Sequence, residues 1–457
     1  MKKTTIAAIA TAVGVGGIGI VRLSGPEALA IGDLVFRSRG GKISEQPGYT
    51  ARYGTVIEVA TGKIIDEAIA LLMRAPASYT REDVLELQCH GGPVALSAVL
   101  KEVLAAGAVL AQPGEFTQRA FLNGRLDLAQ AEAVCDVIRA STEANLALAG
   151  RQLQGKLSQQ VKSLREQLLS LEAQLEVGID FPDEDLPELE RLGLKQRLAE
   201  ISQQIERLLA EGEQGRIWRE GLATVIAGKP NVGKSSLLNL LVGHKRALVT
   251  DIPGTTRDVI EETINLAGLP LRLLDTAGIR KTDDVVEQLG VNTAKEQLKA
   301  AELVLLVLDA ERPWEDEDQL IYSLCSNKKT LLLLNKIDVG RKLTPADLEQ
   351  LCPQEQIIPI SVKTKQGLDK LEEAIVQSAF GGQQLEHVSV SNRRHLEALK
   401  RGQTALKEAI EAATAGFSYD IISTDVRAAR LELGKITGET MTEELLDRIF
   451  ADFCLGK

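Results

Sequence analysis

Apolar residues recur at helical spacing on both sides of the middle of the chain. From Leu157 to Leu175 they step by four and three residues in turn, and a second stripe begins at Leu198. The spacing returns at Leu396 and again at Leu446. Because such steps put apolar side chains on one helix face, we expect long helices that form the core of a bundle. An exposed coiled-coil arm is the alternative interpretation.

The first 123 residues have a different pattern, with short apolar runs that are typical of strands. Two such runs lie on either side of Thr61-Gly62 within residues 53–73, and residues 83–89 alternate between apolar and polar. A helical pattern follows and ends near Gly107. This mixture predicts an α+β module.

In the middle of the chain, residues 222–227 form an apolar run that leads into Gly-Lys-Pro-Asn-Val-Gly-Lys-Ser-Ser at residues 228–236. Leucines follow at helical spacing. The glycines let the backbone turn its N–H groups inward, and the dipole of the following helix faces an anion. The pattern therefore predicts a phosphate loop, in which Lys234 reaches the β- and γ-phosphates and Ser235 holds Mg²⁺. The candidate nucleotide-binding residues of this loop are Asn231, Val232, Gly233, Lys234, Ser235 and Ser236.

Three further motifs follow apolar strands, in the order expected of a GTP-binding module. The first puts a carboxylate at a strand end, where it can reach Mg²⁺ through water. The second ends in Asp338, which can accept hydrogen bonds from N1–H and N2–H of guanine, a donor pair that adenine lacks. The third would close over guanine O6, and all lie at the strand edge where open parallel sheets bind ligands. The motif residues are Asp275, Thr276, Ala277 and Gly278; Asn335, Lys336 and Asp338; and Ser361, Val362 and Lys363.

Hydrolysis of GTP needs a group that orients the attacking water, which in small GTPases is a glutamine near the motif that corresponds to residues 275–278 here. Here the residue after Gly278 is Ile279, which cannot do so. The charged residues within reach are Arg280, Asp283, Asp284 and Glu287, and the alternative for each is solvated charge on a surface loop.

Residues 250–258 lie between the phosphate loop and Asp275, where a switch loop belongs. Thr256 could supply a Mg²⁺ ligand when the γ-phosphate is bound, which would order the loop. The side-chain carbonyl of Asn231 and backbone carbonyls of the loop could together hold a monovalent cation that offsets charge in the transition state. The candidate residues of the loop are Thr250, Asp251, Ile252, Pro253, Gly254, Thr255 and Thr256.

The composition limits the class of protein. The chain has 457 residues, of which 44% are hydrophobic, and a net charge of −11. That charge argues against a protein that coats nucleic acid through bulk charge, although a local basic patch could still dock RNA. Five scattered cysteines without a C-x-x-C pair indicate reduced thiols. Threonines and glycines interrupt the apolar amino end, which argues against a signal peptide, and no run is long enough to cross a bilayer, so we expect a soluble, cytoplasmic protein.

Signatures near the two ends of the chain narrow the kind of GTPase. The chain ends in Phe-Cys-Leu-Gly-Lys at residues 453–457, and it carries Gly-Glu-Phe-Thr at 114–117 and Arg-Leu-Asp-Leu-Ala-Gln-Ala-Glu at 125–132. With these signatures and the nucleotide motifs, the chain resembles the MnmE (TrmE) family of potassium-activated, tRNA-modification GTPases. The resemblance covers nearly the whole chain.

The resemblance implies an activity, two partners and a folate. Members of the family hydrolyse GTP within a complex that installs an aminomethyl-type or carboxymethylaminomethyl group on C5 of the wobble uridine of certain tRNAs. They act with a flavin-dependent partner of the MnmG type, draw one carbon from 5-formyl-tetrahydrofolate or a related folate, and form homodimers through their amino-terminal domains. By motif position, the folate contacts would be Arg22, Glu86, Arg125 and Lys457.

The resemblance also implies roles in catalysis. Glu287 would orient the attacking water once K⁺ has ordered the switch loop. Cys454 is the family's candidate functional thiol, with a small residue in a docked tail as the alternative. The metal ligands would be Ser235 and Thr256 for Mg²⁺, and Asn231, Thr250, Ile252 and Thr255 for K⁺.

The chain is therefore expected to combine α+β, all-α and α/β parts. A folate-binding-like α+β domain would occupy residues 1–123, and a discontinuous helical domain residues 124–220 and 381–457. A P-loop GTPase domain would be inserted between them at residues 221–380. A regulatory GTPase switch in ribosome assembly is the alternative function, although that class usually adds a basic RNA-binding module. A dynamin-like membrane remodeller is the third, and the sequence shows no lipid-binding helix for it.

Overall fold

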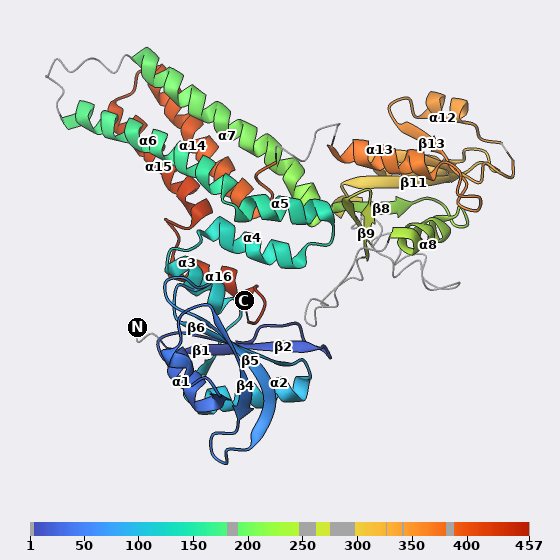
Figure 1. Ribbon diagram of the computed structural model, residues 1–457. Coiled ribbons are helices and arrows are strands. Elements are labelled where there is room, and N and C mark those ends of the chain that lie inside the picture. The colour runs from blue at the N-terminus through green and yellow to red at the C-terminus, as the bar shows by residue number, and fades with distance from the viewer. Residues whose placement is uncertain are drawn as a thin grey trace. The chain divides into compact units, whose positions relative to one another are not determined.

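The computed structural model describes residues 4–180, 191–245, 262–274, 298–325, 327–340, 342–380 and 388–456 (Figure 1). The chain divides into two compact units. One comprises Met1–Cys135, Ser158–Arg165 and Arg430–Lys457, and the other comprises Asp136–Leu157 and Glu166–Ala429. The boundaries expected at residues 123, 220 and 380 remain predictions.

The first unit contains a seven-stranded sheet in the order β3-β4-β5-β6-β2-β1-β7. Its pairs are antiparallel except β1 with β7. The alternation predicted for residues 83–89 is confirmed, since Leu85 and Leu87 enter the core while Glu86 and Gln88 occupy the opposite face of β6. Helices α1 (Ala28–Val35) and α2 (Pro93–Ala105) cover the apolar face. The strands are β1 (Ile6–Ile9), β2 (Ile18–Ser24), β3 (Phe36–Ser38), β4 (Thr50–Ile57), β5 (Ile64–Met73), β6 (Val84–His90) and β7 (Val109–Leu110), with a 3₁₀ turn at Ile43–Glu45.

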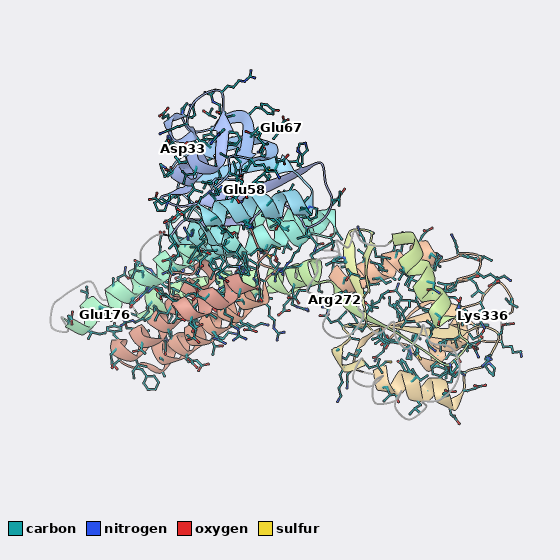
Figure 2. All side chains as sticks on the ribbon, turned by 90° about the horizontal axis from the view of Figure 1, so that it is seen from below. Asp33, Glu58, Glu67, Glu176, Arg272 and Lys336 are labelled. Atoms are coloured by element: carbon teal, nitrogen blue, oxygen red, sulfur yellow. The ribbon has the colours of Figure 1, made fainter. Side chains whose placement is uncertain are left out.

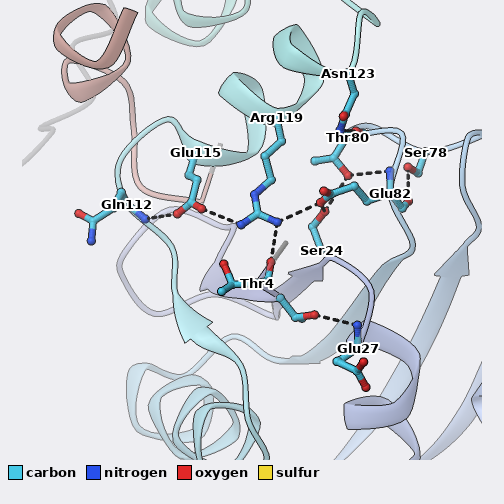
Figure 3. Close-up of polar contacts among 11 residues, drawn as sticks. Thr4, Ser24, Glu27, Ser78, Thr80, Glu82, Gln112, Glu115, Arg119 and Asn123 are labelled. Atoms are coloured by element: carbon cyan, nitrogen blue, oxygen red, sulfur yellow. Dashed lines mark hydrogen bonds and ion pairs between the residues drawn. The ribbon is translucent and has the colours of Figure 1, made fainter. Parts of the chain in front are cut away.

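An arginine ties the next helix, α3 (Glu115–Leu122), to this sheet (Figure 3). The Arg119 guanidinium donates to the Thr4 carbonyl at 2.8 Å, to Glu82 at 3.1 Å and to Glu115 at 2.8 Å. Glu82 is 9% exposed and also accepts from the Ser24 hydroxyl. Because Glu115 belongs to the motif at residues 114–117, that motif has a structural role in anchoring α3.

The last helix, α16 (Glu443–Ala451), packs beside α3 in the same unit. Phe450 and Phe453 are buried there with Leu128. Gly114 permits the close approach: its φ is 69°, and a Cβ at this position would lie 2.5 Å from the Phe450 carbonyl oxygen. The carboxyl-terminal tail therefore docks on the amino-terminal part of the chain.

In the second unit, helices that precede and follow the central sheet pack on each other. Helices α7 (Arg191–Glu220) and α14 (Arg393–Ala415) run side by side (Figure 1). The buried Gln403 side chain donates to the Ser202 hydroxyl at 2.8 Å, and a Cβ at Gly215 would lie 1.9 Å from the Val390 carbonyl oxygen. This pairing confirms that the α/β part is inserted into a discontinuous helical part.

The stripe from Leu157 to Leu175 is buried throughout, which favours the bundle core over an exposed arm. This stripe lies on the last of three successive helices that occupy the stretch between residues 128 and 180. Thr142 caps the second helix by accepting from the Asn145 N–H, and Gly155, with φ of 79°, ends the turn before the third. The remaining helices of these parts are α4 (Leu128–Arg139), α5 (Glu143–Leu153), α6 (Lys156–Asp180) and α15 (Tyr419–Thr437).

The sheet of the second unit has the order β13-β12-β11-β8-β10-β9 and is parallel except for β9. Every residue of β11 is buried, and its side chains alternate between cores on the two faces, as expected of a doubly wound α/β sheet. The strands are β8 (Leu222–Ala227), β9 (Glu262–Leu266), β10 (Leu269–Leu273), β11 (Leu303–Asp309), β12 (Lys329–Asn335) and β13 (Gln356–Pro359). The helices are α8 (Lys234–Lys245), α11 (Asp316–Cys325), α12 (Pro345–Leu351) and α13 (Leu368–Phe380).

None of the helices in the described ranges has the length and apolarity that a membrane crossing requires.

Candidate functional site

The loop between β8 and α8 depends on backbone conformations that glycine permits. Gly228 has φ of 138°, and a Cβ there would lie 2.3 Å from the Val307 carbonyl oxygen. Gly233 has φ of 105°, and its Cβ would lie 2.3 Å from the Asn335 side-chain nitrogen. Asn231 is also left-handed, with φ of 66°. The turns lead directly into the N-terminus of α8, whose N–H groups suit a phosphate.

The motif lysine folds back over this loop. Lys234 Nζ donates to the Gly228 carbonyl at 2.7 Å and to the Lys229 carbonyl at 2.6 Å. Burial lowers the pKa of Lys234, and the charge of Glu317 opposes that shift. The hydroxyl-bearing residues Ser235 and Ser236 are exposed at the start of α8. A cation and two hydroxyls thus lie where the sequence predicts the phosphates and Mg²⁺.

Asn335 joins three of the predicted loops. Its side-chain nitrogen donates to the Val232 carbonyl at 2.8 Å, and its side-chain oxygen accepts from the Val362 N–H at 3.1 Å. Since Asn335 is only 2% exposed, both bonds are sheltered from water. The phosphate loop and the loops after β12 and β13 therefore form one site at the carboxyl edge of the sheet.

The predicted guanine-reading carboxylate is exposed and held in place. The Ser361 hydroxyl donates to Asp338 Oδ1 at 2.7 Å, and this hydrogen bond lowers the pKa of Asp338. An ionised carboxylate accepts hydrogen bonds only, which suits two guanine donors. The exposed Lys363 follows Val362 at the same edge.

Asp309, at the end of β11, is a residue of this edge that no sequence motif predicts. Lys336, labelled in Figure 2, has φ of 67°, and its ammonium lies 2.6 Å from Asp309 at the end of β11. Asp309 is 5% exposed. It belongs to no motif, and its position at the carboxyl end of a buried strand is the only signal that could have found it.

Several predicted residues lie outside the described ranges, and their roles remain predictions. They are Thr250, Asp251, Ile252, Pro253, Gly254, Thr255 and Thr256; Asp275, Thr276, Ala277 and Gly278; Glu287; and Lys457.

The first unit contains a cavity of about 470 Å³ beside one of the predicted folate residues. Arg125 lies over the Tyr79 ring at 4.6 Å and donates to the Tyr79 carbonyl at 3.1 Å. Apart from Arg125, the wall residues were not predicted, because they share no motif. The cavity is lined by Tyr49, Met73, Pro76, Ala77, Ser78, Tyr79, Arg81 and Arg125.

Two further predicted folate residues form an ion pair near Tyr79. Arg22 Nε lies 2.8 Å from Glu86 Oε1, and the two side chains are 15% and 12% exposed. The Arg22 guanidinium lies 6.0 Å from the Tyr79 ring centre and donates to the Gly456 carbonyl at 3.4 Å. Tyr79 thus links Arg22 and Glu86 to Arg125, and the tail residue Gly456 completes the cluster.

Cys454 belongs to the docked tail, and its carbonyl accepts from the Gly114 N–H at 3.3 Å. Cys454 is partly exposed as a residue, whereas the other four cysteines are buried. The functional role predicted for Cys454 remains a prediction, and the docked tail that was its alternative is observed.

Comparison with protein families and curated proteins gives full-length matches. The model described as the MnmE helical domain matches residues 128–454, and the model of the GTP-binding protein TrmE N-terminus matches residues 5–125. The tRNA modification GTPase MnmE of Desulforamulus reducens is 49% identical over 461 residues, covering 100% of each chain. The protein of that name from Geobacillus kaustophilus is 47% identical and covers 99% of each.

Among solved structures, the G domain of the T. maritima FeoB iron transporter is 28% identical, with a TM-score of 0.27. It covers 35% of this chain and 98% of that one.

Proposed function

The chain belongs to the MnmE family of tRNA modification GTPases, and on that premise we propose that it hydrolyses GTP to drive C5 modification of the tRNA wobble uridine. The observation that carries the GTPase half is the meeting of three loops at one sheet edge through Asn335. Asp338 presents an ionised carboxylate there, and Lys234 lies over the phosphate loop.

The geometry supports binding of GTP with its metal ions. Ser235 offers an exposed hydroxyl oxygen at the start of α8, the donor type that Mg²⁺ prefers, and Thr256 would be its second protein ligand. The exposed, left-handed Asn231 offers a side-chain carbonyl for K⁺, with Thr250, Ile252 and Thr255 as further ligands. The bound cations would offset charge that develops on the phosphates.

Within this proposal the chain's own residues have separate tasks. Lys234 neutralises phosphate charge, and Asp338 accepts from the guanine base. Glu287 orients the attacking water, replacing the glutamine that Ile279 excludes. The fixed positions of Lys234 and Asn335 mean that binding requires little reorganisation of this edge.

The cluster around Tyr79 fits a folate. A pterin offers neighbouring N–H donors that suit Glu86, and a folate tail carries carboxylates that suit Arg125 and Lys457. The cavity of about 470 Å³ beside Arg125 falls within the usual size of small-ligand pockets. We propose that 5-formyl-tetrahydrofolate or a related folate binds here, with Arg22 orienting Glu86, and supplies the one-carbon unit.

Exposed apolar side chains on the first sheet support a homodimer through the amino-terminal domain. Exposed apolar side chains gather on β2, β4 and β5, where Ile18 is 68%, Tyr53 is 66% and Ile69 is 42% exposed. Apolar groups of this size on one face favour burial against a second copy. The proposal further includes a flavin-dependent partner of the MnmG type, tRNA as substrate and a cytoplasmic location.

Two measurements test the function. The purified chain in Mg²⁺ and K⁺ should hydrolyse GTP and leave ATP nearly untouched. A strain lacking it should lose the C5 group from wobble uridines in nucleoside analysis, and the full chain should restore it. Unchanged wobble uridines would reject the tRNA half, and GTP-dependent co-sedimentation with ribosomal subunits would then favour the ribosome-assembly alternative.

A further inference from the structure

Lys229 lies at a position of the phosphate loop where the motif allows any residue type. Its side chain is nonetheless buried and paired with two carboxylates. The residue is 4% exposed. Its ammonium lies 2.7 Å from Glu315 Oε2 and 2.7 Å from Asp318 Oδ2. Burial opposes protonation, but hydrogen bonds to Asp318 and Glu315 raise the pKa of Lys229, so it stays charged. A buried ion pair of this kind is costly to break by removing one member.

Asp318, one partner of Lys229, is itself held in place. Asp318 is 4% exposed and lies in the first turn of α11, where its Oδ2 also accepts from the Glu315 N–H at 3.0 Å. This bond, in which the side chain of the third helical residue accepts from the N–H of the residue before the helix, is half of a capping box. The Lys229 side chain is thus paired with the capped start of α11.

The backbone of Lys229 connects the start of α11 to the motif lysine, Lys234. Its carbonyl accepts from Lys234 Nζ at 2.6 Å, and Pro230, with its fixed φ, follows directly. Displacing the Lys229 side chain would therefore move a carbonyl that holds Lys234.

The charges at the start of α11 add a second effect. The first turn of this helix carries Asp316, Glu317 and Asp318, and the charge of Glu317 reaches Lys234. Carboxylates behind a phosphate loop repel the nucleotide anion. The Lys229 ammonium lies 2.7 Å from two carboxylates here, those of Glu315 and Asp318, and offsets their charge.

We propose that Lys229 is a positioning residue of the GTP site. Its ion pairs with Asp318 and Glu315 fix the carbonyl that holds Lys234 and neutralise the acidic start of α11, which would otherwise weaken binding of the triphosphate. This inference rests on the proposed GTPase function and assigns a role that the motif does not.

The test is steady-state GTP hydrolysis by the full chain in K⁺ and Mg²⁺. Lys229→Met should raise KM for GTP at least tenfold and change kcat less than threefold, because the repulsion acts on bound GTP and transition state alike. Lys229→Arg, which keeps the charge, should stay within threefold of the wild type. Since salt screens exposed phosphate charge, the KM defect of Lys229→Met should shrink as ionic strength rises.

A neutralised triple variant separates this role from simple packing. Lys229→Met combined with Glu315→Gln and Asp318→Asn should recover at least threefold in KM over Lys229→Met alone, because no carboxylate is left unpaired. Lys328→Met is the matched control: Lys328 donates to two carbonyls at the opposite edge of the sheet, and KM should not change. If Lys229→Met does not fold, Lys229→Gln replaces it under the same criteria.

A KM within twofold of the wild type for Lys229→Met, a Lys229→Arg variant as damaged as Lys229→Met, or no recovery in the triple variant would each overturn the proposal. A wild-type chain that does not hydrolyse GTP would instead refute the proposed function.

Discussion

Replacement of Gly114 tests whether the carboxyl-terminal tail is docked as the structure describes. Gly114 has φ of 69°, and a Cβ would lie 2.5 Å from the Phe450 carbonyl oxygen and 2.9 Å from Phe453 Cβ. Gly62 has φ of 72° and no neighbour within 4 Å of the same built atom. Gly114→Ala and Gly62→Ala therefore share the backbone strain and differ in the collision.

The expected magnitudes follow from these two contributions. Alanine in the left-handed region costs about 1–2 kcal/mol, which both variants incur. Forcing extra volume into a packed contact costs about 1–3 kcal/mol more, and Gly114→Ala alone incurs it. Undocking the tail relieves that collision, so the excess should shift the undocking equilibrium by roughly 5- to 150-fold.

The assay is the rate at which a thiol reagent modifies the native protein, with the modified cysteine identified by mass spectrometry. Cys454 is the partly exposed cysteine, and its carbonyl accepts from the Gly114 N–H. Gly114→Ala should label Cys454 at least fivefold faster than the wild type, whereas Gly62→Ala should not. Cys89 is the internal control for global unfolding, since it is buried and its pKa is raised to about 12. Equal Cys454 rates in the two variants would refute the docking argument, and so would acceleration at Cys89 that matches Cys454.

Three further predictions concern single residues. Asp338→Asn should weaken GTP binding and strengthen xanthosine triphosphate binding in competition titrations, because an amide replaces one acceptor with a donor; unchanged base preference would contradict the assignment. Glu287→Ala should leave GTP affinity within a few-fold while slowing hydrolysis by at least 10²-fold, and exchange of K⁺ for Na⁺ should slow the wild type; equal turnover in both comparisons would reject the cation-assisted scheme. The hydrogen bond that Asp66 accepts from the His90 ring raises the pKa of His90, so NMR titration should find that pKa above about 6.5 and returned toward it in Asp66→Asn. The sign follows: the pair stabilises the fold below the ordinary histidine pKa, and that stabilisation is lost as pH rises through the raised one.

The elements predicted from apolar runs are largely correct because burial on a sheet leaves a local signature. The run at residues 222–227 coincides with β8, and the helical pattern that ends near Gly107 is α2. Residues buried on both sides of a parallel sheet must be apolar throughout, and β11 is an example. Local pattern and tertiary burial agree at these positions.

Helix boundaries were predicted less well, because caps depend on geometry that residue type alone does not fix. The sequence suggests a capping box between Thr440 and Glu443. In the structure, Thr442 is the N-cap of α16 and makes no side-chain cap bond, while the Thr440 hydroxyl donates to the Leu431 carbonyl at 2.9 Å. A threonine that has a tertiary partner is not available as a cap, and sequence spacing cannot reveal that partner.

The same reasoning explains which site residues can be identified from the sequence. Lys234 and Asp338 are proposed to contact the nucleotide; a ligand dictates the type and spacing of residues that bind it, so the motif identifies them. Residues that hold other site residues in place are dictated by position only. Asp318 pairs with Lys229 from 89 residues further along the chain, and Gly456 accepts from Arg22 at a separation of 434 residues. Many residue types could brace a lysine or an arginine at those points, so no spacing rule marks the ones present. Because an active residue depends on its supports for position, substitutions at Asp318 or Gly456 should change function while every motif stays intact.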